Sequence, residues 1–249
     1  MSSIRIIPSL LYRSGRLVKG KKFDKHIDCG DPVKTCLAFE GQTADEISII
    51  DLGAYERKTK PNFEILKKIN DECNTPISFG GNIQKIEDVE NAIWNGADKV
   101  IINSNINNSK LISEIINKFG SQALIGSVDI TKIDEKYKIF QNKNILEGDV
   151  FDYIKKINAS GVGEIKITYV HKEGTGEKFE LDISNKILKF VNVPVIFEGG
   201  FADLNDIKQA AENNIKAIAL GRMLIYADNN IFKIKQYLQN HNFEVRLRN

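Results

Sequence analysis

Short runs of apolar, mostly β-branched residues alternate with longer amphipathic stretches along the whole chain. Segments such as KIEDVENAIWNGA and DLNDIKQAAENNI place apolar residues at helical spacing. The helix after the first strand has a clear start, because Asp31 suits an N-cap and Pro32 suits the first helical position. The apolar runs predict strands that begin near Ile4, Glu46, Pro76, Lys99, Ala123, Glu164, Pro194 and Ala217.

Eight strand–helix units without a linker predict an α/β fold, a single (β/α)8 TIM barrel domain over residues 1–249. A doubly wound sheet is the alternative, but no GxGxxG follows the first strand. The chain also repeats itself. DEISII aligns with GEIKIT, PISFGGN with PVIFEGG, and GADKVII with NIKAIAL, each at a separation of 118 residues (Asp45 to Gly163, for example). This constant separation predicts two half-barrel repeats. We expect a small hairpin after the fifth strand, in TKIDEKYKIFQNKNILEGD.

Composition narrows the classes of partner. The 35 basic and 33 acidic residues nearly balance, so no overall field attracts nucleic acid. No long apolar run suggests a membrane span or a signal peptide, which favours a cytoplasmic protein. The three cysteines lack a CxxC spacing, so we expect no metal and no cofactor. The basic run 19–25, KGKKFDK, fits either a solvated loop or a loop that binds an anion.

The C-terminal ends of barrel strands carry the chemistry of this fold. Two Gly-Gly turns there expose backbone N–H groups, as phosphate cradles do, and they suit a ligand with two phosphates. The first predicted cradle is Gly80, Gly81, Asn103 and Ser104, and the second is Gly199, Gly200, Gly221 and Arg222. Asp129 ends the fifth strand, where it could be a general base, a helix cap or part of a salt bridge.

Several segments together are similar to those of a known family, namely RIIPSLLYRSGRLVKGKKFDKHIDCGDPV, GADKVIINS, GEIKIT, VPVI and YLQNHNFEVRL. Through them, nearly the whole chain resembles the cyclase subunit of imidazole glycerol phosphate synthase. It implies a barrel that partners a glutaminase as a heterodimer and receives ammonia along its axis. It also implies two catalytic aspartates. One position is Asp129, but the other is Leu11, which cannot carry a proton.

The resemblance further assigns Lys19 and Asp51 to substrate binding. After the sixth strand the family has an Asp-Arg-Asp-Gly-Thr-like run, and here the corresponding residues are His171, Lys172, Glu173, Gly174 and Thr175. At the other end of the barrel, four charged residues match the family's ammonia gate, namely Arg5, Glu46, Lys99 and Glu164. We expect them to form a salt-bridged ring below a dry apolar tunnel. Asp98 matches a residue that meets the glutaminase.

An intact gate beside an altered reaction site allows several interpretations. The first is a divergent branch that channels ammonia for acetamidino modification of a bacterial surface sugar, together with a separate ATP-dependent amidotransferase. The second is a working cyclase of histidine biosynthesis that uses Asp129 with Glu173 or His171. The third is a non-catalytic protein that binds a phosphorylated ligand and activates a glutaminase. An isomerase of the sister half-barrel family would also need an acid on the first strand.

Overall fold

The computed structural model describes residues 3–226 and 229–247, so both ends of the expected 1–249 domain and Ala227–Asp228 lie outside the described residues. Eight parallel strands form a closed barrel, in which each strand pairs with the next and the last pairs with the first. The barrel strands are β1 (Arg5–Arg13), β4 (Ile47–Asp51), β5 (Ile77–Gly80), β6 (Lys99–Ile102), β7 (Leu124–Ile133), β10 (Glu164–Tyr169), β11 (Val195–Glu198) and β12 (Ala217–Leu220). The predicted TIM barrel is confirmed, and each predicted strand start lies within one residue of the observed start.

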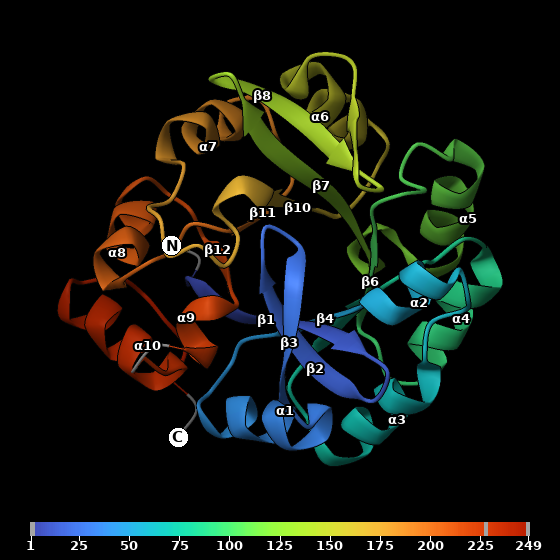
Figure 1. Cartoon of the computed structure of the whole chain (residues 1–249), viewed down its shortest axis with the longest axis horizontal. Coiled ribbons are helices and arrows are strands. Elements are labelled where there is room, and N and C mark those ends of the chain that lie inside the picture. Colours follow the sequence, from blue (N-terminus) through green and yellow to red (C-terminus); the bar gives the residue numbers. More distant parts are fainter. Residues whose placement is uncertain (1–2, 227–228, 248–249) are drawn as a thin grey trace.

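Helices surround the barrel (Figure 1). They are α1 (Pro32–Gly41), α2 (Leu52–Arg57), α3 (Phe63–Glu72), α4 (Ile86–Trp94), α5 (Ser109–Phe119), α6 (Val150–Ala159), α7 (Leu181–Leu188), α8 (Leu204–Glu212), α9 (Arg222–Ile225) and α10 (Ile231–Asn240). Asp31 caps α1 as predicted, because its carboxylate accepts the backbone N–H of Lys34 at 2.9 Å. Among the described residues, no helix combines the length and apolarity needed to cross a membrane.

Two apolar clusters divide the interior. The larger one lies between the strands and the helices and includes Leu66, Val89 and Ile115. The smaller one lies inside the barrel, where inward-facing positions alternate with outward-facing ones along each strand. Its members are Ile7, Ile101, Ile125, Ile196, Ala217 and Ala219. The two clusters together hold the strands in place from both faces.

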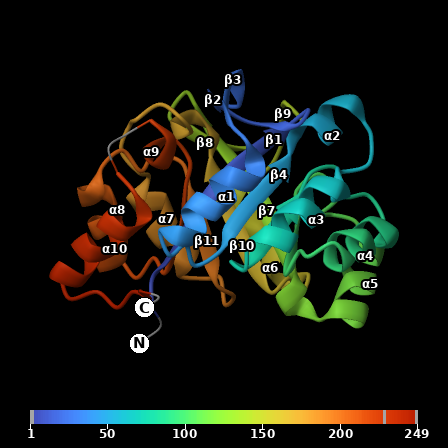
Figure 2. The same cartoon turned by 90° about the horizontal axis from the view of Figure 1, so that it is seen from below.

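Two hairpins rise from the barrel at one end (Figure 2). The first strand continues beyond the barrel and pairs antiparallel with β2 (Arg16–Lys21), which pairs with β3 (Asp24–Gly30). The fifth barrel strand does the same with β8 (Lys136–Gln141) and β9 (Asn144–Leu146), so the predicted second hairpin is confirmed. The region 19–25 is therefore part of a hairpin rather than a free loop. The hairpins extend the first strand of each half, as expected for half-barrel repeats.

Candidate active site

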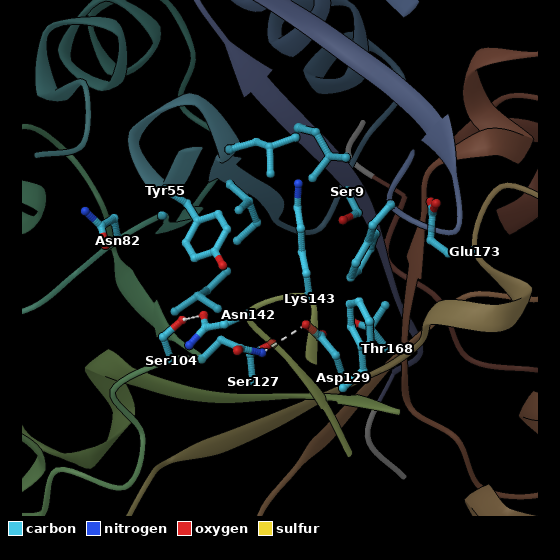
Figure 3. Close-up of a pocket in the computed structure, with 18 of the residues that line it drawn as sticks. Ser9, Tyr55, Asn82, Ser104, Ser127, Asp129, Asn142, Lys143, Thr168 and Glu173 are labelled. Atoms are coloured by element: carbon cyan, nitrogen blue, oxygen red, sulfur yellow. Dashed lines mark hydrogen bonds between the residues drawn. The ribbon is translucent and has the colours of Figure 1, made fainter. Parts of the chain in front are cut away.

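A cavity of about 420 Å³ opens at the C-terminal ends of the strands. The tips of both hairpins stand over its mouth, where the rings of Phe23 and Phe140 have centroids 6.3 Å apart. On the rim, Ser104 Oγ donates a hydrogen bond to Asn142 Oδ1 at 2.6 Å (Figure 3). The cavity therefore has the place and the size of a small-molecule site.

Asp129 faces this cavity from β7 (Figure 3). Asn103 Nδ2 donates to its carboxylate at 3.1 Å. Burial in the barrel mouth raises the pKa of Asp129 to about 7, although the positive charge of Lys166 opposes the rise. A carboxyl group with this pKa is partly ionised at neutral pH, so it can both take up and release a proton.

Leu11 lines the cavity from β1. In the closed sheet, β1 and β7 are separated by three strands in either direction, so Leu11 and Asp129 stand on opposite sides of the mouth. An apolar side chain therefore occupies the position where the resemblance implies a second acid–base group.

Lys19 and Glu173 form a buried ion pair between the main cavity and a smaller pocket of about 20 Å³. Both side chains are almost fully buried. Burial raises the pKa of Glu173 and outweighs the opposing effect of Lys19, so the net shift is upward. Among the described residues, Glu173 Oε2 is buried without a hydrogen-bond partner. His171 Nε2 donates to the carboxylate of Glu180 at 2.9 Å and does not line the cavity. Of the two suggested substitutes for Leu11, the structure places Glu173 in the cavity.

The two predicted phosphate cradles occupy different pockets. Gly81, Asn103 and Ser104 line the main cavity. The smaller pocket is lined by Glu173, Gly174, Gly199, Gly200, Gly221 and Arg222. A Cβ at Gly221 would lie 2.3 Å from Lys19 Nζ, so a larger residue there would displace the end of the lysine side chain. The lysine ammonium thus lies directly beside the second cradle.

Three predicted binding residues line neither pocket. Asp51 is buried and caps α2, since its carboxylate accepts the N–H groups of Ala54 and Asn62 at 2.8 Å each. Gly80 lies in the barrel wall, where a Cβ would be 2.8 Å from the carbonyl oxygen of Ile101. The hydroxyl of Thr175 donates to the carbonyl oxygen of Lys172 at 2.9 Å. Their assignment to substrate binding stays a prediction.

An ion pair that the sequence did not suggest crosses the barrel interior. Lys166 Nζ lies 2.8 Å from Glu198 Oε2 and 3.4 Å from the hydroxyls of both Ser9 and Ser48. The strands β10 and β4 are opposite each other in the closed sheet, so the Lys166 side chain spans the barrel. Lys166 and Glu198 both line the floor of the main cavity. The expected dry tunnel is therefore apolar only below this level.

The four predicted gate residues do form a ring at the N-terminal end. Lys99 Nζ lies 2.8 Å from Glu46 and 2.9 Å from Glu164. Arg5 closes the ring with a 3.2 Å contact to Glu46 and a second ion pair to Glu164. Burial lowers the pKa of Lys99, but the two glutamates outweigh it and the net shift is upward. Positive and negative groups alternate around the ring.

Comparison with known proteins identifies the family to which this chain belongs. Residues 5–230 match the family described as "Histidine biosynthesis protein". The chain belongs to this family, among the HisF-type cyclases. It is 32% identical to the imidazole glycerol phosphate synthase subunit HisF of Campylobacter concisus, over 98% of both chains. It is 33% identical to the subunit of the same name from Sulfolobus acidocaldarius, over 99% of this chain and all of the relative. The HisF subunit of Alkaliphilus metalliredigens is 34% identical over the full length of both.

The sequence did contain a signal for the Lys166–Glu198 ion pair, which was not predicted. In EIKITY, Glu164, Lys166 and Thr168 alternate with apolar residues, and alternation places all three on one face of the strand. Because Glu164 was expected to face the barrel axis, Lys166 should face it too. Glu198 follows from the same rule in VIFE.

Proposed function

We propose that this HisF-type protein is the ammonia-accepting subunit of a glutamine amidotransferase and that it catalyses the cyclase reaction of imidazole glycerol phosphate synthase. The observation that carries the proposal is the ring of Arg5, Glu46, Lys99 and Glu164. The names and full-length coverage of the HisF relatives support it.

The ring suits an entrance for ammonia. The side chains of Arg5 and Lys99 are 25% and 23% exposed, whereas those of Glu46 and Glu164 are nearly buried, so the cations face the outside. Glu46 Oε1 has no hydrogen-bond partner among the described residues and can accept an N–H of an incoming ammonia molecule. The apolar cluster of Ile7, Ile101 and Ile125 lies above the ring and favours the neutral form. Asp98 is exposed beside Lys99, which suits contact with a glutaminase in a heterodimer.

Chemistry takes place in the cavity at the other end. Asp129 is the proton-transfer group, because its carboxyl group faces the cavity and titrates near neutrality. Glu173, with one oxygen unpartnered, takes the part that Leu11 cannot. The two cradles hold the phosphates of a ribulosyl-bearing precursor. Lys19 lies beside the second cradle and neutralises part of the phosphate charge.

The decisive assay gives the purified chain the bisphosphate precursor of imidazole glycerol phosphate with excess ammonium at alkaline pH. Product from the unmodified chain, and its loss in Asp129→Asn, are expected. With a glutaminase present, Lys99→Glu should lower product formed from glutamine and leave product formed from ammonium unchanged. A chain that forms no product from ammonium, while Leu11→Asp does, is not a working cyclase.

A second candidate function is favoured by Leu11 and by the charged cavity floor of Lys166 and Glu198. In this candidate the barrel delivers ammonia for acetamidino formation on a surface sugar, and a separate ATP-dependent enzyme activates the acceptor. It requires the same ring but no proton transfer at Leu11. A reconstituted system in which Lys99→Glu abolishes glutamine-dependent amidination of the sugar, with no imidazole product under any condition, would select it. A barrel that only activates the glutaminase would leave both products absent.

A further inference from the structure

Lys166 occupies an unusual place for a lysine. It projects from the sixth barrel strand into the interior, and it is only 3% exposed although it lines the cavity. Its ammonium is fixed by Glu198 at 2.8 Å and by the hydroxyls of Ser9 and Ser48 at 3.4 Å. The amine is therefore presented at a defined point on the cavity floor.

Stability does not explain this arrangement. A buried ion pair loses hydration that its mutual attraction only partly restores, and apolar residues of similar volume are often as stable or more stable there. Apolar side chains fill part of the same interior, among them Ile101, Ile125 and Ile196, although the hydroxyls of Ser9 and Ser48 contact the lysine. A charged pair among them points to a role in chemistry.

We propose that Lys166 is a nucleophile that forms an iminium with the carbonyl carbon of a phosphorylated ketose bound in the cavity. A desolvated lysine amine is a common partner for carbonyl substrates. The proposal concerns the same cavity as the proposed function, but it requires neither ammonia nor a glutaminase, so either idea can fail without the other.

Residues of the cavity supply and take up every proton that this step moves. The ammonium of Lys166 releases one proton to a neighbouring carboxylate, and the neutral amine adds to the carbonyl carbon to give a carbinolamine. The hydroxyl of the carbinolamine then leaves as water, with the proton returned by the carboxyl group, and a C=N bond replaces the C=O bond. Overall the lysine ammonium and the ketone give the iminium and one water molecule, with no net change in protons.

Two carboxyl groups are placed to carry that proton. Glu198 touches the amine and also accepts a hydrogen bond from the hydroxyl of Thr168 at 3.3 Å. Asp129 senses the charge of Lys166, and its pKa near 7 suits a group that gives back a proton at neutral pH. The floor thus combines an amine with a contacting carboxylate and a second carboxyl group that titrates near neutrality.

Lys22 and Lys143 at the hairpin tips suit a phosphorylated ketose, whereas Arg13 is paired with Glu56 and Lys19 with Glu173. Cationic side chains from the first strand and both hairpins line the cavity, namely Arg13, Lys19, Lys22 and Lys143. Figure 3 shows Lys143 extending toward the middle of the cavity, with Asp129 and Thr168 below. A phosphate bound at the Gly81 turn, which lines this cavity, would let the carbon chain of the ketose pass over the amine.

The test is reductive trapping. The full chain is incubated with ribulose 5-phosphate, reduced with borohydride, digested and mapped by mass spectrometry. We expect a secondary amine on Lys166, carrying the ketose phosphate less its carbonyl oxygen. Lys166→Arg keeps the positive charge opposite Glu198 but forms no reducible iminium, so it should lose the adduct and retain the circular dichroism spectrum of the unmodified chain. Asp129→Asn should slow trapping without removing Lys166 as its site.

The control for random labelling is the set of lysines at the hairpin tips, Lys22 and Lys143, which line the same cavity. An adduct on these lysines equal to that on Lys166, or an adduct yield unchanged in Lys166→Arg, overturns the proposal. Loss of all trapping in the presence of excess inorganic phosphate would show that the ketose binds through its phosphate, as we expect. Trapping that phosphate leaves unaffected counts against a phosphorylated ligand.

Discussion

Replacing Lys166 by Met tests whether the Lys166–Glu198 ion pair is buried so tightly that loss of one charge destabilises the fold. The methionine keeps most of the apolar stem but leaves Glu198 without its cation. The two side chains are 4% and 10% exposed, and their charged atoms are 2.8 Å apart. Removing one member of such a pair costs about 3–5 kcal/mol, because the remaining charge is buried without compensation. We therefore expect a loss of about 3–5 kcal/mol in the free energy of unfolding near pH 8, measured with urea and circular dichroism.

The loss should depend on pH in a defined direction. In the unmodified chain, burial raises the pKa of Glu198, but Lys166 and Lys19 outweigh it and the net shift is downward. That shift stabilises the fold above the ordinary glutamate pKa and is lost as the pH falls through the lowered value. Without Lys166, burial dominates and protonation relieves the unpaired charge. The stability gap between the two proteins should narrow as the pH falls toward the ordinary glutamate range.

The double variant Lys166→Met with Glu198→Leu removes both buried charges and therefore leaves neither one unpaired. It should be close to the unmodified chain in stability, or more stable by about 1–4 kcal/mol. A loss below about 1 kcal/mol in Lys166→Met, or a gap that does not change with pH, would refute the claim that the pair is tightly buried.

Four further results are expected. Asp129→Asn should lower ammonium-dependent product formation by about 10²–10⁴-fold, and the rate of the unmodified chain should rise through a pKa of about 7 as Asp129 ionises to act as a base. Gly221→Ala should weaken phosphate binding in calorimetry, because the new methyl group would lie 2.3 Å from Lys19 Nζ, whereas Gly41→Ala has open space and should bind normally. Lys235→Met should lower the urea midpoint, with a cost of about 3–5 kcal/mol, because the buried Lys235 ammonium pairs with Asp45 at 2.8 Å. Asp31→Ala should cost about 1 kcal/mol through loss of the α1 cap, and Asp31→Asn should recover most of it.

Periodicity was sufficient to predict the barrel, because each strand is a short apolar run and each long helix has an apolar stripe. Local rules placed the cap at Asp31, which the structure confirms. Local rules did not distinguish a polar residue that caps a helix from one that faces the cavity, when both follow the apolar part of a strand. Asp51 ends β4 and caps a helix inside the wall, whereas β7 continues past Asp129 into the hairpin, contrary to the expected strand end, and Asp129 faces the cavity. That difference depends on the path of the chain after the strand, which sequence periodicity does not encode.

The Lys166–Glu198 pair was missed for another reason. Apolar alternation identifies strands through their apolar residues, so an isolated lysine in EIKITY is read as an exposed position. In a barrel both faces of a strand are buried, and a polar residue can face the axis when a partner is available on another strand. The partner here, Glu198, lies on the neighbouring strand β11, two residues beyond Ile196, which is the register partner of Lys166.

The half-barrel repeat gives these residues a common explanation. Positions 118 apart are equivalent, and Lys166 and Ser48, which touch across the axis, have this separation. In the same way the charged residues Asp129, Lys166, Glu173 and Glu198 in the second half correspond to Leu11, Ser48, Tyr55 and Gly80 in the first. Leu11 is thus one of four positions at which the first half is uncharged. Leu11 therefore belongs to a set of positions at which only the second half is charged, whereas the charged Lys19 of the first half corresponds to Tyr137 in the second. A substrate should therefore place its reacting carbonyl toward the second half and its uncharged portion against Leu11 and Tyr55, which line the cavity on the other side.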